Sequence, residues 1–326
     1  MDHTRCKCPR ISIIIPIFDR VTFYSHAIES IIYKKSDVNS IEIILVSNIH
    51  LDINRKSVRV IYTDEKSLSN KIRIGILQSS GDIIAFLEDD DLWEAGKTDS
   101  LVNLFEKNKD LDFYHNGHTF FYSANERGPG LTGKRSGNMH LKIVNGDSVR
   151  NSNRIFNILA RNQASYNLSS MAIRRNFVIQ YIEFFSGFGN DFVDSLVFLI
   201  SASFGQKLAI ESRRLTYIRL HPGNRSGLEI GKDTHIYINF FEKLNKIQAS
   251  KIIHNNTVQL ITRIDTDKCL KSENYSKVIL LKLFKKHLIA SFGCLRFPDR
   301  DIIIKAVFGL ISQTLLRKML GIYHRE

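Results

Sequence analysis

The sequence predicts an α/β protein whose Rossmann-like, mostly parallel sheet is flanked by helices and followed by a helical C-terminal extension. The first observation is a series of short apolar runs, beginning with Ile11–Ile17, that are typical of buried parallel strands. The second is that segments with helical apolar spacing lie between these runs, as right-handed crossovers between parallel strands require. The third is an ordinary globular composition, because 43% of the 326 residues are hydrophobic and 24% are charged.

The elements of the first hundred residues alternate as this fold class requires. The strand at Ile11–Ile17 precedes a helix predicted over Val21–Tyr33. The remaining elements are strands at Ile41–Val46, Val58–Tyr62 and Asp82–Leu87 and a helix over Ser69–Ser79. Ligands bind beyond the carboxyl ends of parallel strands, so Pro16–Arg20 and Glu88–Asp91 are expected at the binding edge.

The composition and the apolar pattern of the chain change twice after the first hundred residues. Residues 112–146 are rich in Gly, Asn, Ser and His, which predicts strands joined by a long loop around Arg127–Asn138. The next predicted elements are a strand at Ser170–Ile173, a helix over Asp191–Phe204 and strands at Leu208–Ile210 and Leu215–Leu220. From His235 the pattern is helical and basic. We therefore expect an N-terminal tail (1–9), a sheet domain (10–230) and a basic helical region (231–326).

Charge and cysteine content restrict the class of protein. The net charge of +13 suits nucleic acid, an anionic membrane surface or a phosphorylated substrate, and does not choose among them. The four cysteines are too few and too scattered for a disulfide framework, which predicts a reduced, cytoplasmic protein. Neither a signal peptide nor an uncharged apolar stretch of about 18 residues is visible, so we expect no spanning helix.

Four consecutive acidic residues, Glu88–Asp91, follow the strand predicted at Asp82–Leu87. Like charges at this spacing repel one another, and a divalent cation would relieve the repulsion. Mg²⁺ and Mn²⁺ suit such oxygen ligands, and Mg²⁺ usually takes one or two carboxylates together with substrate phosphates. The alternative is a solvated acidic loop before the next helix. The position at the ligand edge of the sheet favours the cation site.

Four segments in order resemble family 2 glycosyltransferases, which have the GT-A fold. Ile11–Arg20 resembles the opening strand of that family, and Ser80–Trp93 resembles the strand that leads into its DxD-type motif. Gly187–Asp191 resembles the segment that ends in the catalytic carboxylate, and Arg214–Ser226 the late strand and loop over the diphosphate. The resemblance implies inverting, metal-dependent transfer of a sugar from a nucleoside-diphosphate sugar to a hydroxyl acceptor.

The resemblance also implies residue roles. The Mg²⁺ or Mn²⁺ ion is expected on Asp90, Asp91 and His221, with Asp90 as the first choice; loop structure is the alternative for His221. Asn48 stands where the family commonly has acids. Arg73 is expected to face phosphate, and the alternative is a solvated helix residue. The donor-binding candidates are Pro16, Phe18, Asp19, Asn48, Arg73, Glu88, Asp89, Asp90, His221 and Arg225.

The catalytic base implied by the resemblance is Asp191, because an acceptor hydroxyl attacks well only when a carboxylate takes its proton. Asp194 lies one helical turn further on, points the same way and is the reserve candidate. The alternative for Asp191 is the N-cap of the helix that it begins, a role compatible with the first.

The basic C-terminal region, outside the strong resemblance, suits an anionic membrane surface. Its apolar runs at Val278–Phe297 and Asp301–Tyr323 carry basic residues, as interfacial helices do. A helical subdomain that covers the sheet, or a dimer surface, is the alternative. A peripheral location at the cytoplasmic face would suit a lipid-linked or surface glycan as acceptor.

Two other functional classes compete with the transferase. A nucleotidyltransferase would also use clustered acids and a metal, but Pro16–Arg20 offers no Gly-rich phosphate loop. A non-catalytic basic binding protein on the same fold is the second alternative. Nucleic acid is not an expected partner, because no binding module is recognisable and the acidic run would repel phosphate.

Overall fold

The computed structural model describes residues 11–18, 22–32, 41–53, 55, 57–122, 140–190 and 193–221, with Asn255 and Lys285 as isolated positions. The chain divides into two compact units, residues 1–149 with 154–224 and residues 150–153 with 225–326. Nearly all described residues belong to the first unit. The predicted tail, the loop at Arg127–Asn138 and almost all of the C-terminal region lie outside the described residues, as do Asp19, Asp191 and Arg225.

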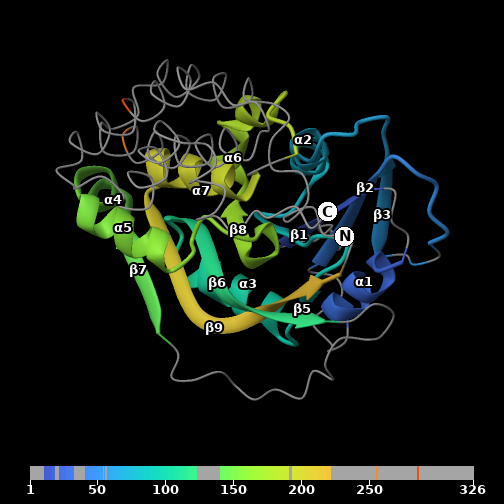
Figure 1. Cartoon of the computed structure of the whole chain (residues 1–326), viewed down its shortest axis with the longest axis horizontal. Coiled ribbons are helices and arrows are strands. Elements are labelled where there is room, and N and C mark those ends of the chain that lie inside the picture. Colours follow the sequence, from blue (N-terminus) through green and yellow to red (C-terminus); the bar gives the residue numbers. More distant parts are fainter. Residues whose placement is uncertain are drawn as a thin grey trace, which may run out of the picture. The chain divides into compact units, whose positions relative to one another are not determined.

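The N-terminal half of the sheet is parallel, as the alternating pattern predicts. Strand β1 (Ile11–Ile17) pairs in parallel with β2 (Ile41–Ser47) and with β4 (Ile83–Phe86). Strand β3 (Val58–Tyr62) pairs in parallel with β2 and lies at the edge (Figure 1). These four bounds match the predicted strands to within one residue at either end. The carboxyl ends of β1, β2 and β4 therefore meet along one edge.

The other half of the sheet is mixed. Strand β8 (Met171–Arg174) lies antiparallel between β4 and β6 (Leu111–Tyr122). The described strands follow the order β3-β2-β1-β4-β8-β6-β9-β5, with β7 (Leu141–Asn145) also paired to β9. Strand β9 (Lys207–Leu220) is long and strongly bent (Figure 1), and it joins the two short strands predicted at its ends into one. It pairs with β7 through its first half and with β5 (Leu92–Trp93) through its second.

Helices cover both faces of the sheet (Figure 1). One face carries α2 (Leu68–Gln78), α6 (Arg175–Ile179) and α7 (Val193–Phe204). The opposite face carries α1 (Tyr24–Ile32) and α3 (Lys97–Lys107). The shorter helical elements are α4 (Gly146–Asn151), α5 (Asn153–Arg161), η2 (Leu168–Ser170) and η3 (Ile182–Phe185).

The core explains why the strands are continuously apolar rather than alternating. Ile11, Ile13 and Ile15 of β1 belong to the same buried cluster as residues of α1 and α3. Ile14 faces α2 instead, where a Cβ on Gly75 would come within 2.5 Å of the Ile14 Cγ2 atom. Because both faces are covered, every residue of β1 is buried. Gly75 lets α2 pack closely on the sheet, beside the end of β1.

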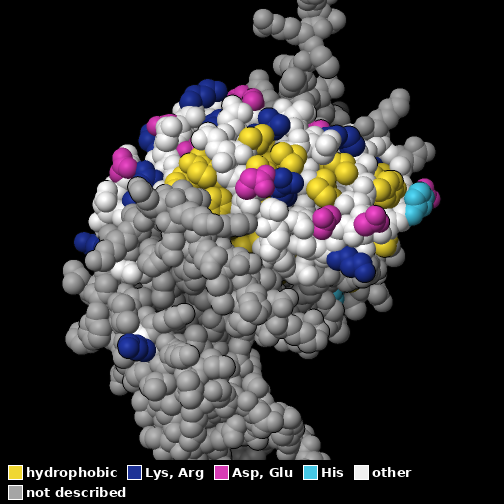
Figure 2. Space-filling model, turned by 90° about the horizontal axis from the view of Figure 1, so that it is seen from above, with side chains coloured by type: hydrophobic (Ala, Val, Ile, Leu, Met, Phe, Trp, Pro, Cys, Tyr) yellow, Lys and Arg dark blue, Asp and Glu magenta, His cyan; other side chains and the backbone are white. Residues whose placement is uncertain are grey.

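The described surface seen from above mixes all kinds of side chain. Figure 2 shows hydrophobic, basic and acidic groups interspersed over that face, without a large area of one charge on its described part. Within the described ranges, no helix combines the length and the apolar character that crossing a membrane requires. The Trp93 side chain is 1% exposed, which agrees with a packing role.

Candidate active site

The acidic turn, defined as Glu88–Asp91, lies directly beyond the carboxyl end of β4. The Leu87 amide donates to the carbonyl of Ile14 (3.1 Å), so the chain stays on the sheet until the turn begins. The Asp91 amide then donates to the carbonyl of Glu88 (3.2 Å), which closes the turn. The three aspartates of the turn, Asp89, Asp90 and Asp91, are each less than 8% exposed. A buried acidic turn does not fit the alternative of a solvated loop.

A polar segment ahead of β8 holds the acidic turn in place. The Asn167 amide group donates to Glu88 Oε2 (3.3 Å) and to Asp91 Oδ2 (3.1 Å). The Ser169 hydroxyl donates to Asp91 Oδ2 (2.6 Å) and accepts from the Glu88 backbone amide (2.9 Å). Asn167 has a φ of 68°, a left-handed conformation uncommon outside glycine. This strained residue therefore positions two carboxylates at once.

Asp90 and His221, 131 positions apart, meet at the site. His221 follows β9, and its Nε2 atom lies 3.1 Å from Asp90 Oδ2. Arg219 of β9 reinforces the approach, because its Nε donates to the Asp90 carbonyl (2.9 Å) and its backbone amide to Asp91 Oδ1 (3.1 Å). The Arg219 guanidinium is stacked over Phe23, with 4.4 Å to the ring centroid. The end of β9 is thus fastened to the acidic turn.

Asp91, one of the expected metal ligands, is held by protein donors through both of its carboxylate oxygens. Its Oδ2 atom accepts from Ser169 and Asn167, and its Oδ1 atom accepts from the Arg219 amide. Asp91 therefore connects the turn to η2 and β9, whereas the Asp90 carboxylate faces His221.

A buried cation lies at the carboxyl ends of β1 and β2, which we call the donor edge because they carry the donor-binding candidates Phe18 and Asn48. Lys71 of α2 is fully buried, and its Nζ donates to the Ile17 carbonyl and to Asn48 Oδ1, the latter at 2.6 Å. The same Nζ lies 3.9 Å from the centroid of the Phe18 ring. Asn48 and Phe18, both expected at the donor, are thus brought together at the ends of β1 and β2. Lys71 gives no signal in the sequence, because a lysine in a predicted helix is usually exposed to solvent.

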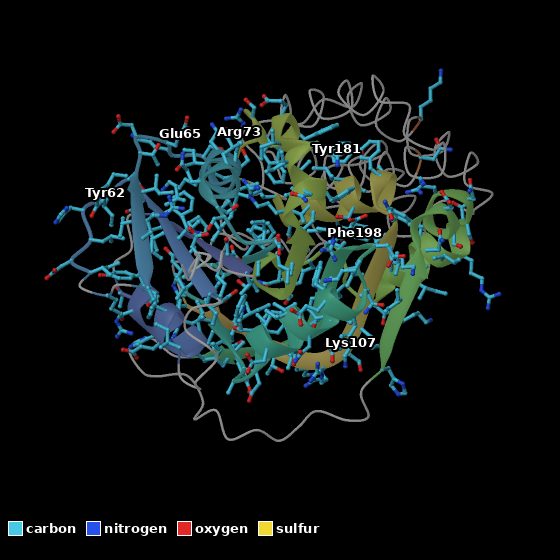
Figure 3. The ribbon with its side chains drawn as sticks, turned by 180° about the vertical axis from the view of Figure 1, so that it is seen from behind. Tyr62, Glu65, Arg73, Lys107, Tyr181 and Phe198 are labelled. Atoms are coloured by element: carbon cyan, nitrogen blue, oxygen red, sulfur yellow. The ribbon has the colours of Figure 1, made fainter. Side chains whose placement is uncertain are left out.

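Arg73 does not have the predicted position. Residues two apart on a helix face nearly opposite sides, so Lys71 and Arg73 cannot both point to the donor edge. The Arg73 guanidinium forms an ion pair with Glu183 instead (2.6 Å), and Figure 3 places Arg73 at the outer surface of α2. Arg73 therefore lies on the outer side of α2, whereas Lys71 lies at the ends of β1 and β2.

The segment that precedes Asp191 is tied to the start of α2. The Leu68 amide donates to Asn190 Oδ1 (2.6 Å), and the Ser69 amide donates to the carbonyl of Gly189 (3.0 Å). The Gly189 amide returns a bond to the Ser69 hydroxyl (3.0 Å), and Gly189 has a φ of 99° that a side chain would strain. Asp191 itself lies outside the described residues, but the chain leading to it is fixed beside α2.

Asp194 belongs to the network around Asn167. Its Oδ2 accepts from the Asn167 backbone amide (2.9 Å), and its Oδ1 accepts from the Ser195 amide (2.7 Å). Burial raises the pKa of Asp194 to about 6, and these backbone bonds oppose the rise. Asp194 thus connects the first turn of α7 with the residue that holds Glu88 and Asp91.

The acidic turn is electrostatically strained. Burial raises the pKa of Glu88 well above its ordinary range, and the charges of Asp91, Asp90 and Asp194 raise it further. Burial, with the charge of Asp90, raises the pKa of Asp91 to about 7. A buried lysine lies behind the turn, where Lys97 Nζ donates to the Ser169 carbonyl (2.7 Å) and to Thr216 Oγ1 (2.9 Å). Added positive charge in front of the turn would relieve the remaining repulsion.

Glu88→Gln is expected to raise the melting temperature at pH 7.5 by roughly 3–6 °C in a chelating buffer. Glutamine can still accept the bond from Asn167 and removes a buried charge. The sign follows from the raised pKa. Above pH 4.5, the ordinary pKa of glutamate, Glu88 ionises readily in the unfolded chain but not in the folded protein, so the wild-type protein loses stability as the pH rises. The gain should therefore nearly vanish at pH 4. The measurement is thermal unfolding at both pH values.

The matched control for this stability measurement is Glu183→Gln, which changes an exposed glutamate paired with Arg73. It should shift the melting temperature little at either pH. A Glu88→Gln protein less stable than wild type at pH 7.5 would contradict the account of strain in the acidic turn.

Comparison with known proteins establishes the family. Residues 12–179, more than half of the chain, match Glycosyl transferase family 2, and the chain belongs to that family. An uncharacterized glycosyltransferase of Rickettsia bellii is 28% identical over 148 residues, which cover 41% of this chain and 21% of that protein. A counterpart in Rickettsia felis is 27% identical over 148 residues, covering 41% and 24%. The matched segment thus spans about a fifth to a quarter of these curated relatives.

Solved structures show the same fold. Residues 1–349 of Staphylococcus aureus TarS in complex with UDP superpose with a TM-score of 0.56 at 10% identity, covering 97% of this chain and 93% of that one. The complex of the same protein with UDP-GlcNAc gives a TM-score of 0.53 at 13% identity, covering 86% and 73%. The GT-A arrangement expected from the four motifs is confirmed.

Proposed function

We propose that the chain transfers a sugar from a nucleoside-diphosphate sugar to a hydroxyl acceptor, with inversion and with a divalent cation. The observation that carries the proposal is the buried acidic turn at the end of β4, where Asp90 faces His221 from the end of β9. Lys71 contacts both Asn48 and Phe18 at the ends of β1 and β2. Family membership favours this function over the nucleotidyltransferase and nucleic-acid-binding alternatives.

The residues at the acidic turn fit a cation that is shared with the donor. Within the described ranges, no three His, Cys, Asp or Glu side chains form a complete metal-ligand group. Asp90 and His221 supply a partial set, which agrees with Mg²⁺ or Mn²⁺ taking its other ligands from phosphate. Mutual repulsion among the buried carboxylates favours the added positive charge. When bound, such an ion neutralises the departing nucleoside diphosphate.

The donor edge would hold the nucleotide. Phe18 and Asn48 lie where a nucleoside would enter beyond β1 and β2, and Lys71 orders both. Pro16 in β1 pairs with Val46 in β2, which sets the spacing of the two strand ends. Glu88 and Asp89 complete the edge, while Asp19 and Arg225 remain candidates on sequence grounds alone.

Proton removal is assigned to Asp191. In a single displacement the acceptor hydroxyl attacks the anomeric carbon while one carboxylate takes its proton, so no covalent sugar–enzyme intermediate is needed. The ties between α2 and Gly189–Asn190 fix the segment that ends at Asp191. Asp194, whose oxygens both accept backbone bonds, acts as an anchor for Asn167 rather than as the base.

The acceptor and location are proposed from the sequence. A lipid-linked or surface glycan suits an enzyme whose C-terminal runs combine apolar and basic residues. A cytoplasmic protein held peripherally on an anionic membrane surface would meet such an acceptor at the interface. The net charge of +13 agrees with that surface.

Lys71→Met should weaken UDP binding by roughly tenfold or more. The Lys71 ammonium group would then no longer donate hydrogen bonds to the Ile17 carbonyl and to Asn48, which it holds in place at the donor edge. The matched control is Arg73→Met, which removes a cation from the same helix but from its outer side and should stay within about twofold. Calorimetric titration with UDP and Mn²⁺ tests the donor site. Equal affinities for wild type and Lys71→Met would remove the donor edge from the proposal.

A further inference from the structure

The middle of strand β6 pairs irregularly, because β9 has extra residues opposite it. Its pairing with β9 shifts register between Asn116 and Gly117 and again between Gly117 and His118. Gly117 suits this point, because a Cβ there would come within 2.9 Å of the Ser212 carbonyl oxygen. Bulges of this kind bend a strand and re-aim the side chains that follow, often next to active sites.

Two histidines of β6 contact the same neighbour. His115 Nε2 lies 2.9 Å from the Tyr166 carbonyl oxygen, and the His118 ring lies 5.3 Å from the Tyr166 ring. His115 thus contacts the backbone of Tyr166 and His118 contacts its side chain, so the middle of β6 lies against this residue.

Three aromatic rings follow one another at this place. The His118 ring meets the Tyr166 ring at 60° and the Phe120 ring at 80°, with 5.3 Å between centroids in each pair. Tyr166 is 36% exposed and Phe120 is 47% exposed. We call Tyr166, His118 and Phe120 the aromatic platform. It presents ring surface to solvent rather than to the core.

Polar atoms lie beneath and beside the platform. The Nδ1 atoms of His115 and His118 and the Oδ1 atom of Asn116 are buried and make no hydrogen bond to the described residues. Asn116 and His115 are at most 1% exposed. Buried polar atoms are seldom left without partners, so this part of β6 is polar in character although it lies beneath aromatic rings.

The platform adjoins the acidic turn. Tyr166 directly precedes Asn167, whose amide group donates to Glu88 and Asp91. Besides burial, the charges of Glu88, Asp194 and Asp91 raise the pKa of the Tyr166 hydroxyl, so the ring lies within their electrostatic reach. A molecule on the platform would thus be next to the reacting groups.

We propose that the aromatic platform is the acceptor subsite and that it takes a neutral pyranose ring. The inference rests on the proposed transferase function and names its acceptor class. One face of a pyranose carries C–H groups that pack on aromatic rings, while its hydroxyls need hydrogen-bonding groups such as the Tyr166 hydroxyl and the His118 ring.

Two other acceptor chemistries fit less well. A phosphate-bearing polyol would meet repulsion from Glu88 and Asp194. A purely apolar chain would give no hydrogen bond to the Tyr166 hydroxyl or to the His118 ring. The combination of ring surface, polar atoms and nearby negative charge selects a neutral sugar.

The test measures binding of methyl β-D-glucopyranoside to the full chain saturated with UDP and Mn²⁺, by saturation-transfer NMR. Tyr166→Ala and His118→Ala should each raise the dissociation constant by about fivefold or more. Tyr166→Phe keeps the ring and should stay within about twofold. The matched control is Tyr62→Ala, which removes an exposed tyrosine from β3.

Titration of each variant with UDP accompanies the test and should give the wild-type affinity, which reports a folded donor site. Unchanged pyranoside affinity in both alanine variants would overturn the proposal, as would tighter binding of glycerol 3-phosphate than of the pyranoside. Wild-type protein that binds UDP but no pyranoside would also overturn it while leaving the proposed function intact. Failure to bind UDP would instead remove the proposed function.

Discussion

Asp90→Asn is expected to abolish the metal-dependent part of nucleoside-diphosphate-sugar binding. Asp90 faces His221, whereas the neighbouring Asp91 has both oxygens engaged by protein donors. Asparagine keeps the size of the side chain and removes its negative charge, so the proposed cation site would lose its first-choice ligand. We expect at least about a hundredfold weaker binding of UDP-GlcNAc in Mn²⁺ and a loss of about 10³ in transfer rate.

The control for this prediction is Asp82→Asn, which changes an exposed acid just before β4 and should leave binding and transfer unchanged. Calorimetry with and without Mn²⁺ gives the binding part, and release of UDP gives the transfer part. If Asp90→Asn bound the donor as tightly as wild type in Mn²⁺, ligation would have to be assigned to another residue. UDP-GlcNAc is the probe because the structurally similar TarS was solved with it.

Asp191→Asn is expected to separate binding from catalysis. The donor should bind within about twofold of the wild-type affinity, while transfer falls by about 10² to 10⁴, the usual contribution of a general base. The reason is that an uncharged amide cannot accept the acceptor's proton as the hydroxyl attacks. Paired measurements of donor affinity and of single-turnover transfer distinguish this result from loss of the donor site.

Asp194→Asn provides the comparison for Asp191. Both Asp194 oxygens accept backbone amides, so its replacement should disturb Asn167 and lower thermal stability, with a smaller effect on transfer. Full transfer by Asp191→Asn, together with a larger loss in Asp194→Asn, would show that the two roles are reversed. The raised pKa of Asp194, about 6, would then belong to the catalytic base.

The strands of the first half were predictable because burial on both faces leaves a simple signal. Ile11–Ile17 and Ile41–Ser47 are continuous apolar runs, and both match their strands closely. Helix α3 was not predicted, because only a few of its side chains, Leu101 and Phe105 among them, are buried and apolar. The single β9 was read as two strands, because the charged residues Glu211–Arg214 interrupt its apolar pattern.

The site was predictable where charge and position agreed. Four acids after a buried strand indicated the acidic turn, and the late His-Pro-Gly loop indicated His221; the structure brings Asp90 and His221 together. The supporting residues carried no such signal. Asn167 and Ser169 lie in an ordinary polar stretch. The sequence favours Arg73 over Lys71 by residue type, but their positions around the helix decide that Lys71 points to the ends of β1 and β2 and Arg73 to Glu183.

Metal-dependent donor binding is tested most directly by calorimetric titration of the wild-type chain with UDP- and GDP-linked sugars, in Mn²⁺ and in a chelating buffer. We expect at least one of these donors to bind about tenfold or more tightly with Mn²⁺, because a cation at the acidic turn would offset its negative charge toward a diphosphate. Absence of metal-dependent binding for every donor would contradict this expectation and would leave a non-catalytic member of the same fold.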